Sequence, residues 1–299
     1  VCSMHVLIQR LLYSIFIVSI NFAVVSCAGQ KDNLAFLPEQ KLYEASQRAL
    51  KRSDYLGAIE ALQKLESDFP FGKYAQSSQL SLVFAYFKTD DNALADSSAK
   101  RFIRLHPNHT DVDYAYYMLG LNSYPKPGSL FQTFIGADLS KKDTKSAQIA
   151  FANFSQLVTR FPESQYTADS IKRLEFLRNL LARSEIHIAN YYLGRQAFLS
   201  AANRGRFVVE NYQETPSMPD ALAIMVQSYH ALGMQDLGQN SLAVLRLNYP
   251  DYPALNVDGE FNYQYYVKDV TSVIGLATFG LIDYSKPPGF DTRNKYGRF

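Results

Sequence analysis

The chain has 299 residues, with 30 lysines and arginines against 28 aspartates and glutamates and a formal net charge of +2. This balance argues against a nucleic-acid partner, because binding a phosphate backbone needs clustered Lys and Arg side chains. The 21 tyrosines and 20 phenylalanines, with no tryptophan, are typical of surfaces that recognise other chains and equally of helical cores.

The first predicted element is a secretory signal peptide over residues 1–26. Arg10 precedes a mostly apolar stretch that ends in small residues, as in cleavable signals. This stretch is shorter than the about 20 residues that a spanning helix needs. Its end, Val24-Val25-Ser26-Cys27, resembles the lipobox of bacterial lipoproteins. The resemblance implies that Cys27 is acylated and starts a lipidated linker over residues 27–38. An ordinary signal peptide with an incidental cysteine is the alternative.

The cysteine count supports lipidation. Cys2 and Cys27 are the two cysteines of the sequence, so cleavage before Cys27 leaves no pair to form a disulfide. Two or three acyl chains give a lasting anchor, whereas a single chain is marginal. Ala28, rather than Asp, follows the cysteine, which in lipoproteins implies the outer membrane.

The next part of the chain repeats itself. A small residue is followed, twelve positions later, by a proline in three segments, with apolar residues at helical spacing between them. The three segments cover residues 58–70, 95–107 and 150–162, and degenerate copies of the pattern cover 201–213 and 238–250. An amphipathic stretch precedes each copy. The pattern resembles the tetratricopeptide repeat, in which a small residue lets two antiparallel helices approach and a proline ends the second helix.

The predicted fold is therefore all-α, a tetratricopeptide-repeat superhelix of about five helix pairs with a concave side. An irregular helical bundle is the alternative. We expect the following organisation: repeats one to three over residues 39–163 with an insertion at 122–142, a connecting helix at 164–181, repeats four and five at 182–250, and an irregular tail at 251–299. The tail's apolar run, residues 273–282, is too short to cross a bilayer as a helix.

No catalytic motif is recognised in the sequence. His106, His109, Asp111 and Asp113 form the one cluster with ligand-like residue types. They surround a helix-ending proline, where polar residues are expected in any case, so we predict no catalytic residue, no metal and no cofactor. An enzyme carried on a helical scaffold is the alternative that this cluster would support.

Several segments match more than a generic repeat. They are residues 69–75, 79–88, 101–107, 113–121, 134–138, 164–167 and 173–177. Together with the lipobox they resemble the BamD (ComL) family, the lipoproteins of the β-barrel assembly machinery. The resemblance implies a non-catalytic adaptor, lipid-anchored at the periplasmic face of the outer membrane. Its implied partners are the barrel-forming subunit BamA, other lipoproteins of the machinery, and unfolded outer-membrane β-barrel proteins.

Ligands of tetratricopeptide arrays usually lie along the first helix of each pair. Counting within the repeats predicts a substrate-peptide groove lined by Tyr43, Gln47, Leu50, Lys51, Phe84, Phe87, Lys88, Tyr114, Tyr117 and Leu121. Our hypothesis is that the rings take the apolar side chains of a barrel protein's C-terminal signal and that Lys51 or Lys88 takes its carboxylate. The alternative is that the rings pack between repeats and the lysines are solvated.

Family resemblance also implies that the C-terminal half binds BamA, with Arg204 beside the interface. Arg204 could equally be a surface cation. A competing function is that of a tetratricopeptide-repeat lipoprotein that scaffolds cell-wall or envelope-division machinery.

Overall fold

The computed structural model describes residues 37–125, 139–141, 144–265 and 289–296. Five predictions from the sequence lie wholly or largely outside these residues: the signal peptide at 1–26, lipidation at Cys27, the linker at 27–38, the insertion at 122–142, and the apolar run at 273–282. No helix within the described ranges is long and apolar enough to cross a membrane.

The chain forms two compact units, divided after Thr89. In the N-terminal unit, helices α2 (Glu39–Lys51), α3 (Tyr55–Asp68) and α4 (Ala75–Lys88) pack in sequence, α3 against both neighbours. The Asp54 side chain caps α3 by accepting a 3.0 Å hydrogen bond from the backbone N–H of Gly57.

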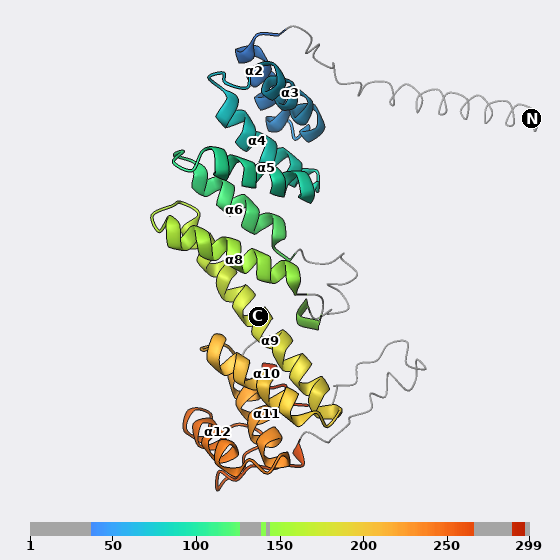
Figure 1. Ribbon diagram of the computed structural model, residues 1–299, viewed down its shortest axis with the longest axis vertical. Helices are drawn as coiled ribbons and strands as arrows, with labels where there is room; N and C mark the ends of the chain where they lie inside the picture. The colour runs from blue at the N-terminus through green and yellow to red at the C-terminus, as the bar shows by residue number, and fades with distance from the viewer. Residues whose placement is uncertain (1–36, 126–138, 142–143, 266–288, 297–299) are drawn as a thin grey trace, which may run out of the picture. The chain divides into compact units, whose positions relative to one another are not determined.

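The C-terminal unit continues the pattern, with each long helix packed on the next (Figure 1). Its elements are α5 (Asn92–Leu105), α6 (Val112–Ser123), the 3₁₀ turn η2 (Leu139–Lys141), α8 (Lys145–Arg160), α9 (Thr167–Gly194), α10 (Phe198–Asn211), α11 (Met218–Ala231), α12 (Gln235–Asn248) and the short α14 (Arg293–Tyr296). Helix α9 is continuous over 28 residues. It includes most of the stretch at 164–181 predicted as a connecting helix and the first helix predicted for repeat four.

The repeated proline stops the second helix of a pair in the same way each time. Helices α3, α5, α8 and α12 each end two residues before a proline. The residue between, for example Phe69 or Phe161, has φ near −132° and ψ near 60°, outside the α region, because a following proline disfavours helical geometry. Tyr212 adopts nearly the same angles although Gln213 replaces the proline, which shows that the degenerate repeat keeps its structure.

Small residues set how closely the paired helices approach. Ala58, Ala150 and Ala201 are fully buried. At Gly205 on α10, an added Cβ would lie 2.8 Å from the backbone oxygen of Ala221 on α11, so the position admits glycine alone without a shift of the backbone. The prediction of an all-α fold of tetratricopeptide-like helix pairs is confirmed.

The described part of the tail packs back on the last helices. Tyr252, Ala254, Phe261 and Phe290 are buried in one apolar cluster with side chains of α9, α10, α11 and α12. The side-chain amide of Asn190 on α9 pairs with the backbone of Phe290, donating to its oxygen at 2.8 Å and accepting from its N–H at 2.9 Å. These tail segments therefore belong to the core of the C-terminal unit.

A buried carboxylate joins four segments of this unit. Asp220 on α11 accepts a 2.8 Å hydrogen bond from Arg183 on α9, and both side chains are fully buried. It also accepts from the Tyr252 hydroxyl at 3.0 Å and from the Thr292 hydroxyl at 2.7 Å. Asp291 lies 3.5 Å from the same Arg183 nitrogen. Burial, followed by the charge of Asp220, raises the pKa of Tyr252 well above its ordinary value.

We expect Asp220→Ala to speed amide exchange in α11 by roughly 100-fold or more, because a buried ion pair that loses one partner costs about 3–5 kcal/mol. Hydrogen-exchange mass spectrometry of the full chain measures this directly. Asp258→Ala, at an exposed aspartate of the same tail, is the control and should leave α11 unchanged. Equal exchange rates in the two variants would contradict the role given to the network.

Candidate functional site

The groove residues predicted in the N-terminal unit lie on α2 and α4. We call this set the α2–α4 patch: Tyr43, Gln47, Leu50, Lys51, Phe84, Phe87 and Lys88. The two lysines are exposed in the last turns of their helices, and the other five side chains are half-buried. Cations at helix C-termini are favoured by the helix dipole, so the lysine positions also have a structural reason.

Internal contacts fix part of the α2–α4 patch. Tyr43 stacks on Tyr74 with ring centroids 4.5 Å apart. The Gln47 amide donates to the Ser81 hydroxyl at 3.3 Å and so links the two helices. The Lys88 ammonium lies 5.4 Å from the centre of the Phe84 ring, within cation–π range. The structure thus links α2 to α4 through Gln47 and Ser81, and it leaves the two lysines exposed and the five other patch side chains half-buried.

The predicted groove residues of the C-terminal unit are on α6. Packing against side chains of other segments restricts them more than the residues of the α2–α4 patch. Tyr117 stacks on Tyr166, with ring centroids 4.7 Å apart, and Tyr114 packs against the same ring at 5.6 Å. Leu121 packs on the apolar cluster formed by α8 and α9. Burial raises the pKa of Tyr114 and, aided by a hydrogen bond to Asp169, that of Tyr117.

Asp169 and Arg173 on α9 form a polar group beside these α6 residues, and the sequence analysis did not predict it. The Tyr117 hydroxyl donates to Asp169 at 2.8 Å, and Arg173 donates to the same carboxylate at 2.5 Å. Burial opposes ionisation of Asp169, but these hydrogen bonds outweigh it and lower its pKa below the ordinary value. The Arg173 guanidinium also lies 4.8 Å from the Tyr124 ring centre. The available signal was the helical spacing of Asp169 and Arg173 on one face of α9, which begins directly after Tyr166.

Arg204, predicted to lie beside a partner interface, is partly exposed on α10. It donates a 2.9 Å hydrogen bond to Glu185 on α9, and its side chain is 42% exposed. This hydrogen bond raises the pKa of Arg204, against the effect of burial. The guanidinium therefore has both an internal partner and a face open to another molecule.

Residues of the predicted cluster at 106–113 make contacts with neighbouring side chains of the fold. The rings of His106 and His109 pack on Phe102 at 5.1 and 5.3 Å. Asp113 accepts from the Ser164 hydroxyl at 2.5 Å. Within the described ranges, no three His, Cys, Asp or Glu side chains gather closely enough to hold a metal ion.

Comparison with known proteins gives one consistent match. A family model described as outer membrane lipoprotein, YfiO, matches residues 37–245. An outer membrane protein assembly factor BamD of Neisseria meningitidis is 36% identical over 80% of this chain and 91% of its own length. The BamD of Vibrio cholerae is 34% identical over 74% of this chain and 92% of its own length. The chain therefore belongs to the BamD (YfiO) family of outer membrane lipoproteins.

Proposed function

We propose that this chain is an outer-membrane lipoprotein that serves, without catalysis, as an adaptor in the assembly of outer-membrane β-barrel proteins. The observation that carries the proposal is the match to assembly factors over nearly their whole length. The adaptor would bind the barrel-forming subunit BamA, other lipoproteins of the machinery, and unfolded barrel proteins. An acylated Cys27 would hold it at the periplasmic face of the outer membrane, since two or three acyl chains suffice for lasting attachment.

The α2–α4 patch is the proposed site for the C-terminal signal of an unfolded barrel protein. Half-buried rings such as Phe84 and Phe87 offer apolar area to the signal's side chains. Because packing already restricts these rings, binding costs them little further side-chain entropy. Lys51 and Lys88, both exposed, would take the terminal carboxylate through a charge-assisted hydrogen bond. Tyr114, Tyr117 and Leu121, on α6 of the C-terminal unit, are proposed as a separate apolar contact for the peptide, with the Tyr117 hydroxyl donating to Asp169.

Reversing both lysines tests the carboxylate contact. Lys51→Glu/Lys88→Glu should weaken binding of a C-terminal signal peptide by about ten-fold or more, because it replaces attraction with repulsion. Titration of the full chain with a fluorescently labelled peptide measures the affinity. Lys41→Glu/Lys64→Glu, two lysines of the same unit with carboxylate partners, makes the same change in net charge.

We expect this second variant to bind the peptide as the unaltered chain does. Unchanged affinity in Lys51→Glu/Lys88→Glu, or an equal loss in both variants, would remove the lysines from the peptide site.

Arg204 is the proposed contact to BamA. Its exposed face can reach a partner carboxylate while Glu185 fixes its position. Replacing a charge at an interface with its opposite weakens association more than removing it does. The neighbouring Arg206 is exposed and pairs with Glu210 on the same helix, and it offers a matched control.

Co-purification tests both the function and this contact. From detergent-extracted membranes, the unaltered chain should retain the barrel-forming subunit, and Arg204→Glu should retain about a tenth as much. Arg206→Glu should retain the full amount. Failure of the unaltered chain to retain the barrel-forming subunit would contradict the proposed function. Equal retention by the two arginine variants would contradict only the role of Arg204.

A further inference from the structure

The described tail segment at residues 289–296, which we call the strap, lies outside the residues 37–245 that the family model matches. It includes the short helix α14. Its hydrogen-bond partners on α9 and α11 precede it by 100 and 72 positions, and they belong to the C-terminal unit. The strap is therefore a separate segment laid on helices that pack on one another. We call the residues that hold it the strap site: Arg183, Asn190, Asp220, Asp251 and Tyr252.

One fully buried ring anchors the strap. Phe290 has no exposed surface, and its ring stacks on Tyr265 with centroids 5.9 Å apart. At the other end of the strap, the Tyr296 ring lies 6.3 Å from that of Tyr252, and the Tyr296 hydroxyl donates to Asp251 at 2.9 Å. A buried aromatic anchor with a few directed contacts around it is a common way for proteins to recognise a short peptide.

The strap site pairs with the backbone of the strap as well as with its side chains. The Asn190 amide on α9 donates to the Phe290 oxygen at 2.8 Å and accepts from the Phe290 N–H at 2.9 Å. Asp220 on α11 accepts from the Thr292 hydroxyl at 2.7 Å and from the Thr292 N–H at 3.1 Å. Because each of these two side chains satisfies two groups of the strap, together they fix its register along α9 and α11.

Charge also favours an occupied strap site. Arg183 and Asp220 form a fully buried pair at 2.8 Å, and the strap brings Asp291 to 3.5 Å from the same Arg183 nitrogen. Without the strap, Asp220 would lose the two donors of Thr292, and Arg183 would lose one of its two carboxylates. Buried polar groups that lack partners are costly. An empty strap site is therefore expected to rebind a segment that offers the same groups.

The strap begins at a position that requires glycine. Gly289 has a φ of +151°, and an added Cβ would lie 2.4 Å from the side chain of Asn190. An alanine at this position would strain the backbone and displace the amide that holds the next residue. The contacts thus specify a short sequence over residues 289–292: a glycine, a buried aromatic ring, an acid and a threonine.

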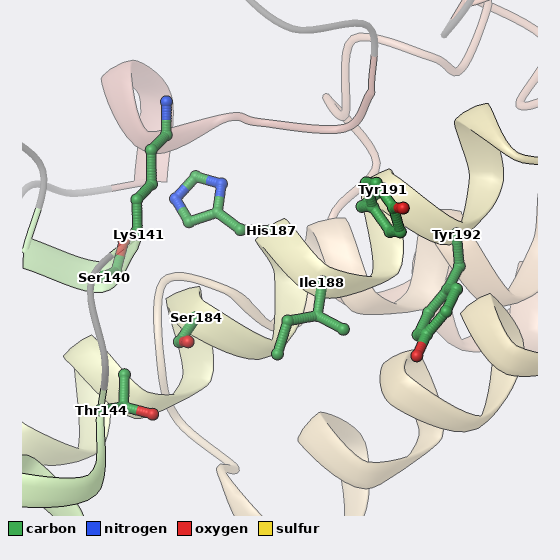
Figure 2. A pocket seen from close by; sticks show the side chains of 8 residues that line it. All are labelled: Ser140, Lys141, Thr144, Ser184, His187, Ile188, Tyr191 and Tyr192. Carbon is green, nitrogen blue, oxygen red and sulfur yellow. The ribbon is translucent and has the colours of Figure 1, made fainter.

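The strap site is separate from a cavity of about 370 Å³ that lies along α9 (Figure 2). Ser184, His187 and Tyr191 line this cavity. Arg183 and Asn190, each one position earlier in the helix than a lining residue, are not among the described lining residues, and neither is any residue of the strap. Since successive residues of a helix point about 100° apart, the cavity and the strap site lie on different faces of α9.

We propose that the strap is a built-in peptide ligand and that the strap site is a peptide-recognition site which the chain itself keeps occupied. The site takes an internal chain segment with the pattern Gly-Phe-Asp-Thr and needs no chain terminus. When the strap leaves, the same site binds an equivalent segment supplied by another molecule. This proposal is independent of the proposed function, because it uses neither the α2–α4 patch nor Arg204 nor the lipid anchor.

The test uses the full chain with Gly289→Ala, which should release the strap without removing any of its side chains. The probe is a fluorescent octapeptide with the sequence of residues 289–296, blocked at both ends so that neither terminus is charged. Anisotropy should show that it binds Gly289→Ala about ten-fold or more tightly than the unaltered chain, where the tethered strap competes at high effective concentration. Gly194→Ala is the matched control, because an added Cβ there meets no atom within 4 Å. It should bind the octapeptide as weakly as the unaltered chain does.

Variants of the octapeptide test the individual contacts. Thr292→Val in the octapeptide keeps the shape of the side chain but removes the hydroxyl donor, so it should bind Gly289→Ala about ten-fold more weakly. Gly289→Ala in the octapeptide should weaken binding to a similar degree, because it places the same added Cβ against Asn190. Equal affinity for all three octapeptides would overturn the proposal.

Hydrogen exchange shows whether the strap has left its site. The amides of residues 290–296 should exchange faster in Gly289→Ala than in Gly194→Ala, while circular dichroism shows the same helix content in both variants. Strap amides that stay protected in Gly289→Ala would overturn the proposal, since the site would then not require glycine. Loss of helix content in that variant would also overturn it, because the strap would then be an obligatory part of the fold. So would fast-exchanging strap amides without binding of the octapeptide.

Discussion

Within each of the two units, the described long helices bury an apolar face against their neighbours in sequence, and the fold of each unit depends on this packing. Small residues make the approach possible: Ala58 and Ala150 are fully buried, and Gly205 leaves no room for a Cβ. Because neighbours in sequence are neighbours in space within each unit, part of each helix surface is left to carry rings and charges. The proposed binding residues on α2, α4 and α6 are partly covered by this packing: the rings are half-buried, and Tyr117 stacks on Tyr166.

Among the described residues, no helix pair follows α12 to cover it. In this chain the described tail segments provide cover, through Tyr252, Phe261 and Phe290. A buried charge fixes their position, because Asp220 accepts hydrogen bonds from Arg183, Tyr252 and Thr292. Such a network tolerates little rearrangement, as each buried polar group needs its partner. Arg204, on α10 of the same unit, has its own contact to Glu185 on α9.

Local sequence patterns predicted the helix pairs because their cause is local. A small residue and a proline twelve positions later determine where two helices cross and where the second ends, so the spacing could be read without tertiary contacts. The continuity of α9 was also available from the sequence, since no proline or glycine interrupts residues 167–193. The tail could not be predicted in this way. Its contacts join residues 72 positions apart, such as Asp220 and Thr292, and no period marks them. The α2 and α4 residues followed from repeat counting, whereas Asp169 and Arg173 act on Tyr117 across helices and have no motif.

These helix pairs are proposed to assist the assembly of outer-membrane β-barrel proteins. Depleting the chain from its own cell and measuring the barrel proteins of the outer membrane tests this role most directly. Folded barrel proteins should disappear from the outer membrane, and envelope division should continue until the barrel proteins have been lost. Normal barrel levels together with a division or cell-wall defect would contradict the account and favour a scaffold of the cell envelope.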